Sequence, residues 1–565
     1  MLDDATPQNR SHPGLGQRRA SAFNKGRQLS PVAHSEIKDL LLGEERTRDR
    51  LVEYLHQIQD AYGKISTDHL RALAEELRLS MAEVFEVASF YAHFDIDMHG
   101  DTGTPKTTVR VCDSLTCEMF GAKSLSKYLG DHVDDNIQIV TASCMGRCDM
   151  APVVEVGHRH VGFANLEKVI STIESKEFTP EIPKYLSYND YIKGEGYTLL
   201  NDCYAGKYNR DDLIDLVQKS GLRGMGGAGF PAGLKWKSIR EQPKPRLMAI
   251  NADEGEPGTF KDRHYLEGDP HRFLEGMLIA AWVCEVEKIY IYVRDEYPAA
   301  RDILIREINT LRSEGLLDNR EIELRRGAGA YICGEESAML DSIEGKRGLP
   351  RQKPPYPTQV GLFGQPSLIH NVETVYWIRS LINRGPEWFS DQGLNGCKGF
   401  HSFSVSGRVK NAGVKRAPAG ITITDLINDY CGGMQDGHQF KAYLPGGASG
   451  GILPASLSDL PLAFGTLEEH GCFVGSAAVI VLSDQDSIKD VSLNLMRFFE
   501  DESCGQCTPC RTGTEKAVQL MREKTWDQDL LMDLSTVMVD ASICGLGQAA
   551  PNPVLCAMKY FPEEL

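Results

Sequence analysis

The chain has 565 residues, of which 41% are hydrophobic and 25% charged, so it can form several domains with cores of their own. Its formal charge of -18 disfavours binding to nucleic acid or to an anionic membrane surface. No stretch approaches the roughly 20 apolar residues that span a bilayer, and the first 30 residues lack the apolar core of a secretory signal. We therefore expect a cytoplasmic protein that binds neither nucleic acid nor membrane.

The first part of the chain predicts an arm followed by a small helical bundle. Residues 1–34 are rich in Arg, Gly, Ser and Pro, a composition typical of a flexible arm. Over 35–100 the apolar residues recur at helical spacing, as in the stripe formed by Leu51, Tyr54 and Leu55. Several short amphipathic helices of this kind are expected to pack as a bundle.

The rest of the chain divides by pattern into four further regions. Residues 105–180 alternate short strands with cysteine-bearing loops and predict a compact α/β domain. Alternating strands and helices over 197–390 predict a parallel sheet, and the stretch before them reads as a linker. Short strands and Gly-rich turns over 398–484 predict an α+β insert, and 485–565 is helical again with a group of cysteines.

The first cysteine set combines Cys112-x4-Cys117 with Cys144-x3-Cys148, each pair just after a predicted strand. The chain has 15 cysteines and no export signal, so clustered cysteines indicate metal or redox groups rather than disulfides. Four thiolates on two neighbouring loops suit a soft metal centre. The spacing favours a [2Fe–2S] cluster, and structural zinc, which more often uses x2 spacing, is the alternative.

The second cysteine set is Cys504-x2-Cys507-x2-Cys510, with Cys544 as a distant fourth candidate. Three thiolates at this spacing with a remote fourth are typical of a [4Fe–4S] cluster, and zinc rarely uses three such close ligands. Cys556 competes with Cys544, but its apolar helical setting indicates packing. The remaining cysteines are expected to be small buried packing residues: Cys203, Cys284, Cys333, Cys397, Cys431 and Cys472.

A glycine-rich run, 224–229, fits the pattern G-x-G-x-x-G, but a predicted helix rather than a strand precedes it. It is therefore not an ordinary dinucleotide fingerprint. Dense glycine still lets backbone N–H groups approach a phosphate or a flat ring, and Lys235 adds a positive charge nearby.

Two further segments have polar residues where a ligand site is expected. Residues 251–258 follow a predicted strand, and the carboxyl ends of parallel strands commonly face ligands. Residues 325–337 place small residues before Glu335 and Glu336. A flavin or nucleotide site is one interpretation, and a solvated helix start with acids that complement the helix dipole is the other.

These residues resemble a known family. The runs 223–236, 251–263 and 326–337 look like the NADH- and FMN-binding subunit of respiratory complex I, and the second cysteine set is similar to its [4Fe–4S] ligands. Residues 35–176 resemble the neighbouring complex I subunit, a helical bundle with a thioredoxin-like [2Fe–2S] domain. The resemblance therefore implies a multidomain α/β and α+β chain. Its expected parts are a helical bundle, a thioredoxin-like domain, a Rossmann-like FMN/NADH domain, a ubiquitin-like insert and a C-terminal helical [4Fe–4S] domain.

The resemblance also implies site residues. Glu256 and Glu336 are expected to meet the nicotinamide dinucleotide and to take part in catalysis. Other residues expected to contact the dinucleotide are Phe230, Lys353 and Tyr356. The FMN contacts would be Gly224, Gly226, Gly227, Lys235, Asn251, Asp253, Tyr331, Gly334, Glu335, Ile369, His370, Asn371 and Thr374. The chain departs from the complex I pattern at Met225, Ser238, Tyr356 and His370, which affects the adenine contact most.

Fused chains of this type occur in NAD-dependent molybdenum or tungsten formate dehydrogenases and in bidirectional NiFe hydrogenases. Residues 345–351, 369–374 and 542–553 look closest to the formate dehydrogenase beta subunit. We therefore expect electrons from formate, oxidised in an alpha subunit, to pass through [4Fe–4S] and FMN to NAD⁺. The alternatives are the diaphorase subunit of a NiFe hydrogenase and a non-catalytic scaffold held by zinc.

Overall fold

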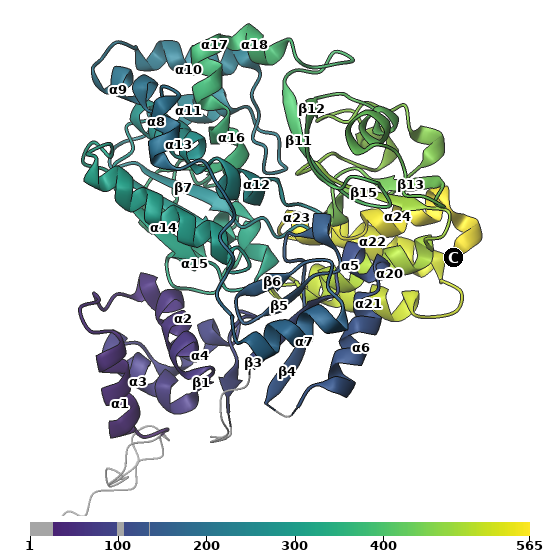
Figure 1. Cartoon of the computed structure of the whole chain (residues 1–565), viewed down its shortest axis with the longest axis horizontal. Coiled ribbons are helices and arrows are strands. Elements are labelled where there is room, and N and C mark those ends of the chain that lie inside the picture. Colours follow the sequence, from purple (N-terminus) through teal and green to yellow (C-terminus); the bar gives the residue numbers. More distant parts are fainter. Residues whose placement is uncertain (1–25, 99–106, 135) are drawn as a thin grey trace, which may run out of the picture.

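The computed structural model describes residues 26–98, 107–134 and 136–565. The expected flexible arm therefore falls largely outside the described residues. In Figure 1 the N-terminal helices (purple) and the first cysteine domain (blue) lie below a sheet domain (teal). The insert (green) and the C-terminal helices (yellow) lie beside that sheet domain. No helix among the described residues has the length and apolar character needed to cross a bilayer.

The N-terminal bundle forms because Ser residues cap its helices and apolar stripes face one another. Ser30, Ser66 and Ser80 each accept a backbone N–H at a helix start, and Ser80 forms a reciprocal capping box with Glu83. The first helix starts at Pro31, a little before the expected bundle start. The helices are α1 (Pro31–Leu40), α2 (Leu51–Tyr62), α3 (Thr67–Leu77) and α4 (Met81–Ala88).

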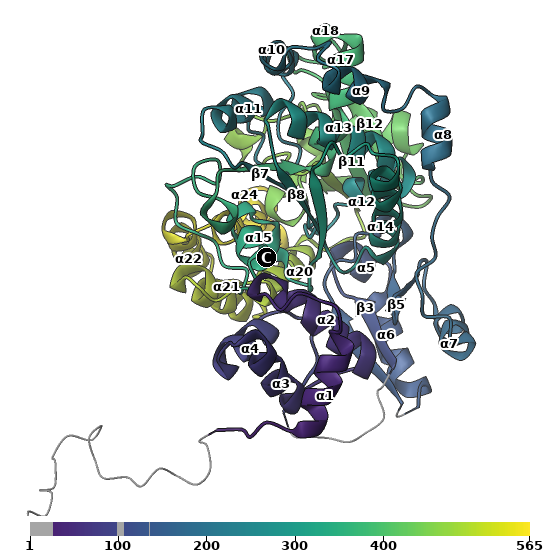
Figure 2. The ribbon, with the colours of Figure 1, turned by 90° about the vertical axis from the view of Figure 1, so that its left-hand side faces the viewer.

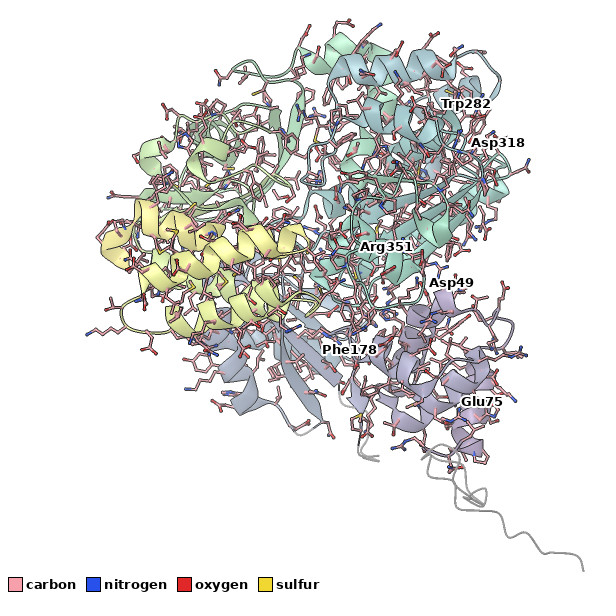
Figure 3. All side chains as sticks on the ribbon, turned by 180° about the vertical axis from the view of Figure 1, so that it is seen from behind. Asp49, Glu75, Phe178, Trp282, Asp318 and Arg351 are labelled. Carbon is pink, nitrogen blue, oxygen red and sulfur yellow. The ribbon has the colours of Figure 1, made fainter. Side chains whose placement is uncertain are left out.

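Salt bridges join this bundle to the sheet domain. Arg325 pairs with Asp49 (2.6 Å) and Glu53 (3.3 Å), and Arg326 pairs with Asp60 (2.5 Å). In Figure 3, Asp49 lies where the bundle meets the sheet domain, and Figure 2 shows α2 facing that domain from another side. Arg325 and Arg326, at the end of one strand of the sheet domain, therefore hold the bundle against that domain.

The first cysteine domain is a mixed four-stranded sheet with three helices. Strand β3 pairs in parallel with β4 and antiparallel with β5, giving the order β4-β3-β5-β6. This arrangement confirms the thioredoxin-like fold. The strands are β3 (Thr107–Cys112), β4 (Ile137–Ala142), β5 (Val154–Val156) and β6 (Arg159–Val161), and the helices are α5 (Leu115–Met119), α6 (Ala122–His132) and α7 (Leu166–Ser175).

The sheet domain contains a fully parallel four-stranded sheet in the order β10-β7-β8-β9. Its strands are β7 (Leu247–Ala252), β8 (Lys288–Val293), β9 (Glu321–Arg326) and β10 (Ser367–Asn371). Asn371 pairs in register with Asn251, so two expected site residues lie side by side at the carboxyl edge. The parallel Rossmann-like arrangement is confirmed.

Helices surround this sheet, and one helix, α8, lies in the stretch expected to be a linker. They are α8 (Tyr188–Lys193), α9 (Thr198–Tyr204), α10 (Arg210–Ser220), α11 (Ala232–Arg240), α12 (Lys261–Gly268), α13 (Pro270–Val283), α14 (Pro298–Ser313), α15 (Glu336–Ile343), α16 (Val372–Tyr376), α17 (Ile378–Arg384) and α18 (Pro386–Ser390). Side chains alternate along the strands: Met248 and Ile250 join one core, and Ala249 joins the core that contains α15.

The insert is a five-stranded mixed sheet in the order β12-β11-β15-β13-β14. The strands are β11 (Phe400–Gly407), β12 (Gly413–Pro418), β13 (Phe440–Leu444), β14 (Leu453–Pro454) and β15 (Ala478–Ser483). The chain then ends in a helical region consisting of α20 (Ile488–Asp501), α21 (Thr508–Met521), α22 (Gln528–Ala541), α23 (Gly545–Ala549) and α24 (Asn552–Tyr560).

Candidate functional site

A cavity of about 1140 Å³ lies where the sheet domain, the insert and the C-terminal helices meet. Its volume exceeds the upper end of ordinary ligand pockets, which reach about 1,000 Å³. All but one of the non-cysteine residues expected at the site line it. These are Gly224, Gly226, Gly227, Phe230, Lys235, Asn251, Asp253, Glu256, Tyr331, Gly334, Glu335, Glu336, Lys353, Tyr356, Ile369, His370 and Asn371.

The exception is Thr374, which is buried and does not line the cavity. Its Oγ1 accepts a hydrogen bond from the Met225 N–H at 2.9 Å. Thr374 therefore supports the glycine-rich loop from behind, whereas direct contact with FMN had been expected. A β-branched residue in the first turn of α16 can do this because its short hydroxyl reaches a neighbouring backbone.

The glycine-rich loop connects α10 to α11 and is closed by the Gly224 N–H, which donates to Phe230 O at 2.8 Å. Gly227 has φ +122°, a conformation that L side chains rarely adopt. A Cβ on Gly226 would lie 3.2 Å from Asn371 Cβ. Glycine at these positions leaves backbone open to the cavity, as a flat ring or phosphate requires.

Glu256 lies on the cavity wall, where its carboxylate accepts three hydrogen bonds. Tyr331 Oη donates to one carboxylate oxygen, and Ser449 donates to the other through its N–H and its Oγ, both at 2.7 Å. Burial raises the pKa of Glu256, and the Tyr331 and Ser449 hydrogen bonds oppose that rise. Hydrogen bonds donated to a carboxyl favour its ionised form over its protonated form.

Two lysines and two glutamates that line the cavity form ion pairs with one another. Lys353 Nζ pairs with Glu335 (2.9 Å) and Glu336 (2.8 Å), and Lys235 Nζ lies 3.8 Å from Glu336. Burial lowers the pKa of Lys235. Glu335 also accepts hydrogen bonds from the Ser337 and Ala338 N–H groups at the start of α15. Glu335 therefore caps this helix and also lines the cavity, so the two interpretations of this segment are compatible.

The carboxyl edge of the sheet contains a network that the sequence analysis missed. Lys261 is almost fully buried, and its Nζ pairs with Asp262 (2.8 Å) and Glu373 (3.2 Å) and donates to Asn371 Oδ1 (3.3 Å). This network fixes the Asn371 amide at the cavity. His370 beside it accepts a hydrogen bond from Trp236 Nε1 at 2.7 Å, and burial lowers its pKa to about 3.

The cavity fits a polar ligand by a further criterion. Asp253 Oδ2 is buried and has no hydrogen-bond partner among the described residues. Burial raises the pKa of this carboxyl well above its usual value. Buried polar atoms are nearly always paired in native proteins, so an unpaired one in a cavity wall suits a ligand that forms a hydrogen bond with it. A flavin ring offers both donors and acceptors.

The first cysteine set comes together as expected. Cys144 Sγ lies 3.3 Å from Cys148 Sγ, and Cys112 lies within hydrogen-bonding reach of Cys117 and Cys144. All four are buried between domains. Arg294 donates to Cys144 O at 2.7 Å, and Arg263 donates to Gly146 O at 2.8 Å, so the sheet domain covers this site.

The second cysteine set lies between α20, α21 and α23. The thiols of Cys504, Cys507, Cys510 and Cys544 interact electrostatically with one another. Only Cys510 of this set is buried, and the other three are partly exposed. The two sets therefore differ: the first is enclosed by the protein, and the second opens towards the surface.

The geometry also bears on the zinc alternative. Four ligands of one zinc ion at about 2.3 Å place their sulfur atoms about 3.8 Å apart. In the described part of the chain, only His56, His93 and Asp295 bring three donor atoms within 4.8 Å of one another. Cysteine spacing therefore remains the argument against zinc, because three ligands at x2, x2 spacing with a remote fourth are typical of a [4Fe–4S] cluster.

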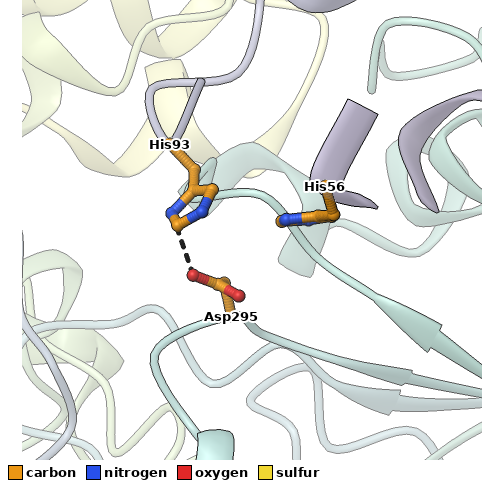
Figure 4. Close-up of side chains that lie close together, drawn as sticks. All are labelled: His56, His93 and Asp295. Carbon is orange, nitrogen blue, oxygen red and sulfur yellow. Dashed lines mark ion pairs between the residues drawn. The ribbon is translucent and has the colours of Figure 1, made fainter. Parts of the chain in front are cut away.

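The group of His56, His93 and Asp295 lies between the bundle and the sheet domain (Figure 4). Asp295 pairs with His93 Nδ1 at 2.9 Å, and it also pairs with Arg301 (3.2 Å) and Arg326 (2.5 Å). Two guanidinium groups already neutralise this carboxylate and would repel a divalent cation. We therefore assign the group to domain docking.

The sequence analysis missed every cavity residue contributed by the insert and the C-terminal helices. These are Gly446, Ser449, Phe473, Gly475, Ser476, Gly545, Leu546, Gln548, Ala549 and Asn552. Asn552 Nδ2 donates to Ser449 O at 2.9 Å, which ties the two regions together at the cavity. Contacts between such distant segments leave no periodic signal in a sequence.

Three family models match the chain. The Nuo51 FMN-binding domain matches residues 217–380, the thioredoxin-like [2Fe-2S] ferredoxin matches 37–177, and the NADH-ubiquinone oxidoreductase-F iron-sulfur binding region matches 490–565. The mitochondrial NADH-ubiquinone oxidoreductase 51 kDa subunit of Neurospora crassa is 40% identical over 376 residues, which are 63% of this chain and 76% of the relative. The chain belongs to the 51 kDa subunit family of NADH-quinone oxidoreductases.

Relatives of the chain also occur in hydrogenases. The NADP-reducing hydrogenase subunit HndC of Solidesulfovibrio fructosivorans is 39% identical over 393 residues, 67% of this chain and 80% of the relative. A chain of an air-oxidised NAD⁺-reducing [NiFe]-hydrogenase superposes with a TM-score of 0.80 at 29% identity. That match covers 92% of this chain and 94% of the hydrogenase chain.

Membership of the 51 kDa subunit family settles the cofactors and the general activity. The protein is an oxidoreductase subunit that binds NADH, FMN, a [2Fe–2S] cluster in its thioredoxin-like domain and a [4Fe–4S] cluster in its C-terminal helices. The family expectation of an NADH/FMN subunit is confirmed, and the non-catalytic zinc scaffold is not supported.

Proposed function

We propose that this 51 kDa subunit homologue is the NAD-linked diaphorase of a formate dehydrogenase, in which a molybdenum or tungsten alpha subunit oxidises formate. The observation that carries its electron-transfer role is the shared cavity. Residues of the sheet domain and of α23 line the same space, and α23 directly follows Cys544. A flavin in this cavity would therefore lie beside the [4Fe–4S] ligands.

Each part of the cavity has a task in this proposal. FMN, when bound, exchanges a hydride with NAD(H) and single electrons with iron–sulfur clusters. The glycine-rich loop and Lys235 would hold its phosphate, and Asn251, Asn371 and Asp253 would orient its ring. Glu256 and Glu336 would contact the dinucleotide, and the surrounding walls exclude water from the ring.

The different exposure of the two cysteine sets supports one point of electron entry into the subunit. The partly exposed [4Fe–4S] cysteines offer a partner cluster the closer approach, and the enclosed [2Fe–2S] cysteines do not. We infer that the alpha subunit delivers electrons at the [4Fe–4S] cluster. Residues 345–351 and 542–553, which resemble the formate dehydrogenase beta subunit, support formate as the donor.

A second candidate is the diaphorase of a bidirectional NiFe hydrogenase. The observation that favours it is the match to the NAD⁺-reducing [NiFe]-hydrogenase chain, which extends over the N-terminal bundle and cysteine domain. The partner metal separates the two candidates.

Purification of the native complex tests the proposal. We expect formate to reduce NAD⁺ and the partner to contain molybdenum or tungsten. Cys504→Ala should lower formate-driven NAD⁺ reduction more than tenfold and leave NADH oxidation by ferricyanide, which takes electrons from the flavin. Cys397→Ala, outside both sets, is the control. NAD⁺ reduction that is driven by hydrogen, in a complex with a nickel-containing partner, would contradict the formate dehydrogenase proposal and support the hydrogenase candidate.

A further inference from the structure

The insert contacts the cavity segment that follows strand β7 through two serine residues. Ser449 donates to Glu256 Oε1 through its N–H and its Oγ, both at 2.7 Å. Ser476 Oγ lies 2.7 Å from Thr259 Oγ1, within hydrogen-bonding distance. A separate domain therefore holds the segment of the sheet domain that carries Glu256.

Ser449 reaches Glu256 because it lies in a tight glycine-rich turn, residues 445–451. Gly447 has φ +77°, and a Cβ at this position would lie 2.7 Å from Glu256 Cγ, so a side chain would push the turn away. The Gly447 N–H donates to Ala478 O at 2.8 Å, at the start of β15, which fixes the turn to the sheet of the insert. The turn is therefore shaped to bring the two Ser449 donors to one carboxyl oxygen.

The C-terminal helices hold the same turn from the other end of the cavity. Asn552, the first residue of α24, donates through Nδ2 to Ser449 O at 2.9 Å. Asn552, Ser449 and Glu256 all line the cavity. Because a backbone N–H can only donate, Glu256 Oε1 accepts from Ser449 in the ionised and in the protonated form of the carboxyl alike. The position of this oxygen therefore does not depend on the charge of Glu256.

We propose that Ser449 is a positioning residue for dinucleotide binding and that it acts through Glu256. This inference rests on the proposed contact between Glu256 and the dinucleotide, and it does not depend on the electron donor. A carboxyl oxygen that is held in place can accept a hydrogen bond from a ribose hydroxyl with little further loss of side-chain freedom, so pre-organisation increases affinity. The Ser449 hydroxyl supplies one of three hydrogen bonds that hold this carboxyl.

Calorimetry of NAD⁺ binding to the oxidised complex measures affinity without turnover. We expect Ser449→Ala to raise the Kd of NAD⁺ about fivefold, as the loss of one hydrogen bond would, and to leave the FMN content unchanged. In NADH oxidation by ferricyanide, KM should rise while kcat changes less than about twofold. Ser449→Thr keeps the hydroxyl and should restore the affinity. Ser456→Ala, at an exposed position of the insert outside the cavity lining, is the control.

A double-mutant cycle shows whether Ser449 acts through Glu256. We expect Ser449→Ala to weaken NAD⁺ binding in the parent protein and to have no further effect in Glu256→Ala, because residues that act as a unit are not additive. Equal effects in both backgrounds would overturn the proposal, since Ser449 would then contact the ligand itself. An unchanged Kd in Ser449→Ala beside a raised Kd in Glu256→Ala would overturn it and leave the Glu256 contact standing. An unchanged Kd in Glu256→Ala would overturn both.

A second pair of variants displaces the turn without removing the hydroxyl. Gly447 and Gly465 have φ +77° and +86°, but a Cβ on Gly447 would meet Glu256, whereas a Cβ on Gly465 has nothing within 4 Å. Alanine therefore strains the backbone at both positions and displaces the turn from Glu256 only at the first. We expect Gly447→Ala to raise the Kd of NAD⁺ more than Gly465→Ala does. Equal Kd values in these two variants would contradict the proposal.

Discussion

Glu256 is the residue on which cofactor choice should depend. Its carboxylate is held by Tyr331 and Ser449 at the cavity wall, and a carboxylate near the ribose repels a 2′-phosphate. We predict that Glu256→Gln raises kcat/KM for NADPH relative to NADH by about tenfold, equivalent to about 1.4 kcal/mol. Steady-state kinetics with both dinucleotides measures this ratio. The exposed Glu241→Gln is the control, and an unchanged ratio in Glu256→Gln would remove this role.

His370 should make stability depend on pH. Its folded pKa of about 3 lies below the ordinary 6.5 because it is buried, so the unfolded chain binds the proton first as pH falls. The stability is therefore fully present above pH 6.5 and decreases towards pH 3. His370→Gln keeps an acceptor for Trp236, and it should reduce this loss by about 1.4 kcal/mol per pH unit. Thermal unfolding at pH 7 and pH 5 measures the effect, with the exposed His132→Gln as control. Equal acid sensitivity in His370→Gln and the parent protein would contradict this account.

Single residues were predictable where a local motif marks them. The spacing of Cys504, Cys507 and Cys510 and the glycines of 224–229 indicated the site region without any structure. Thr374 and Ser449 show the limit. Thr374 lies behind the glycine-rich loop and does not line the cavity, and Ser449 reaches the cavity from a separate domain.

At the scale of elements, the short helix α23 connects the cavity to the [4Fe–4S] ligands. A Cβ on Gly547 would lie 2.4 Å from Ser542 Oγ and 2.8 Å from Cys510 Cβ, and Gly545 has open space. We predict that Gly547→Ala displaces the ligand loop and lowers the [4Fe–4S] content, whereas Gly545→Ala retains it. Iron analysis and the cluster signal in electron paramagnetic resonance, normalised to FMN, compare the two. Full cluster content in Gly547→Ala would show that the loop adapts.

The sequence predicted most elements because caps and periodicity are local. Ser80 with Glu83 marks the start of α4. Strand β10 is harder to predict because its five residues are too short to distinguish from a loop by pattern. It is nevertheless the strand that brings Asn371 next to Asn251.

At the scale of the whole molecule, the order of the domains could be predicted from the sequence, but the contacts between the domains could not. The enclosure of the first cysteine set depends on Arg263 and Arg294 from a distant part of the chain. The docking of the bundle depends on ion pairs of Arg325 and Arg326. Such pairs join residues hundreds of positions apart, so spacing cannot reveal them.

The account rests on a flavin that connects the dinucleotide to the iron–sulfur clusters. The most direct test is an anaerobic NADH titration of the intact protein before and after FMN is removed, with the clusters followed by electron paramagnetic resonance. We predict that NADH reduces the [4Fe–4S] cluster only when FMN is present and that added FMN restores the reduction. Equal reduction of the clusters by NADH in flavin-free protein would contradict the account.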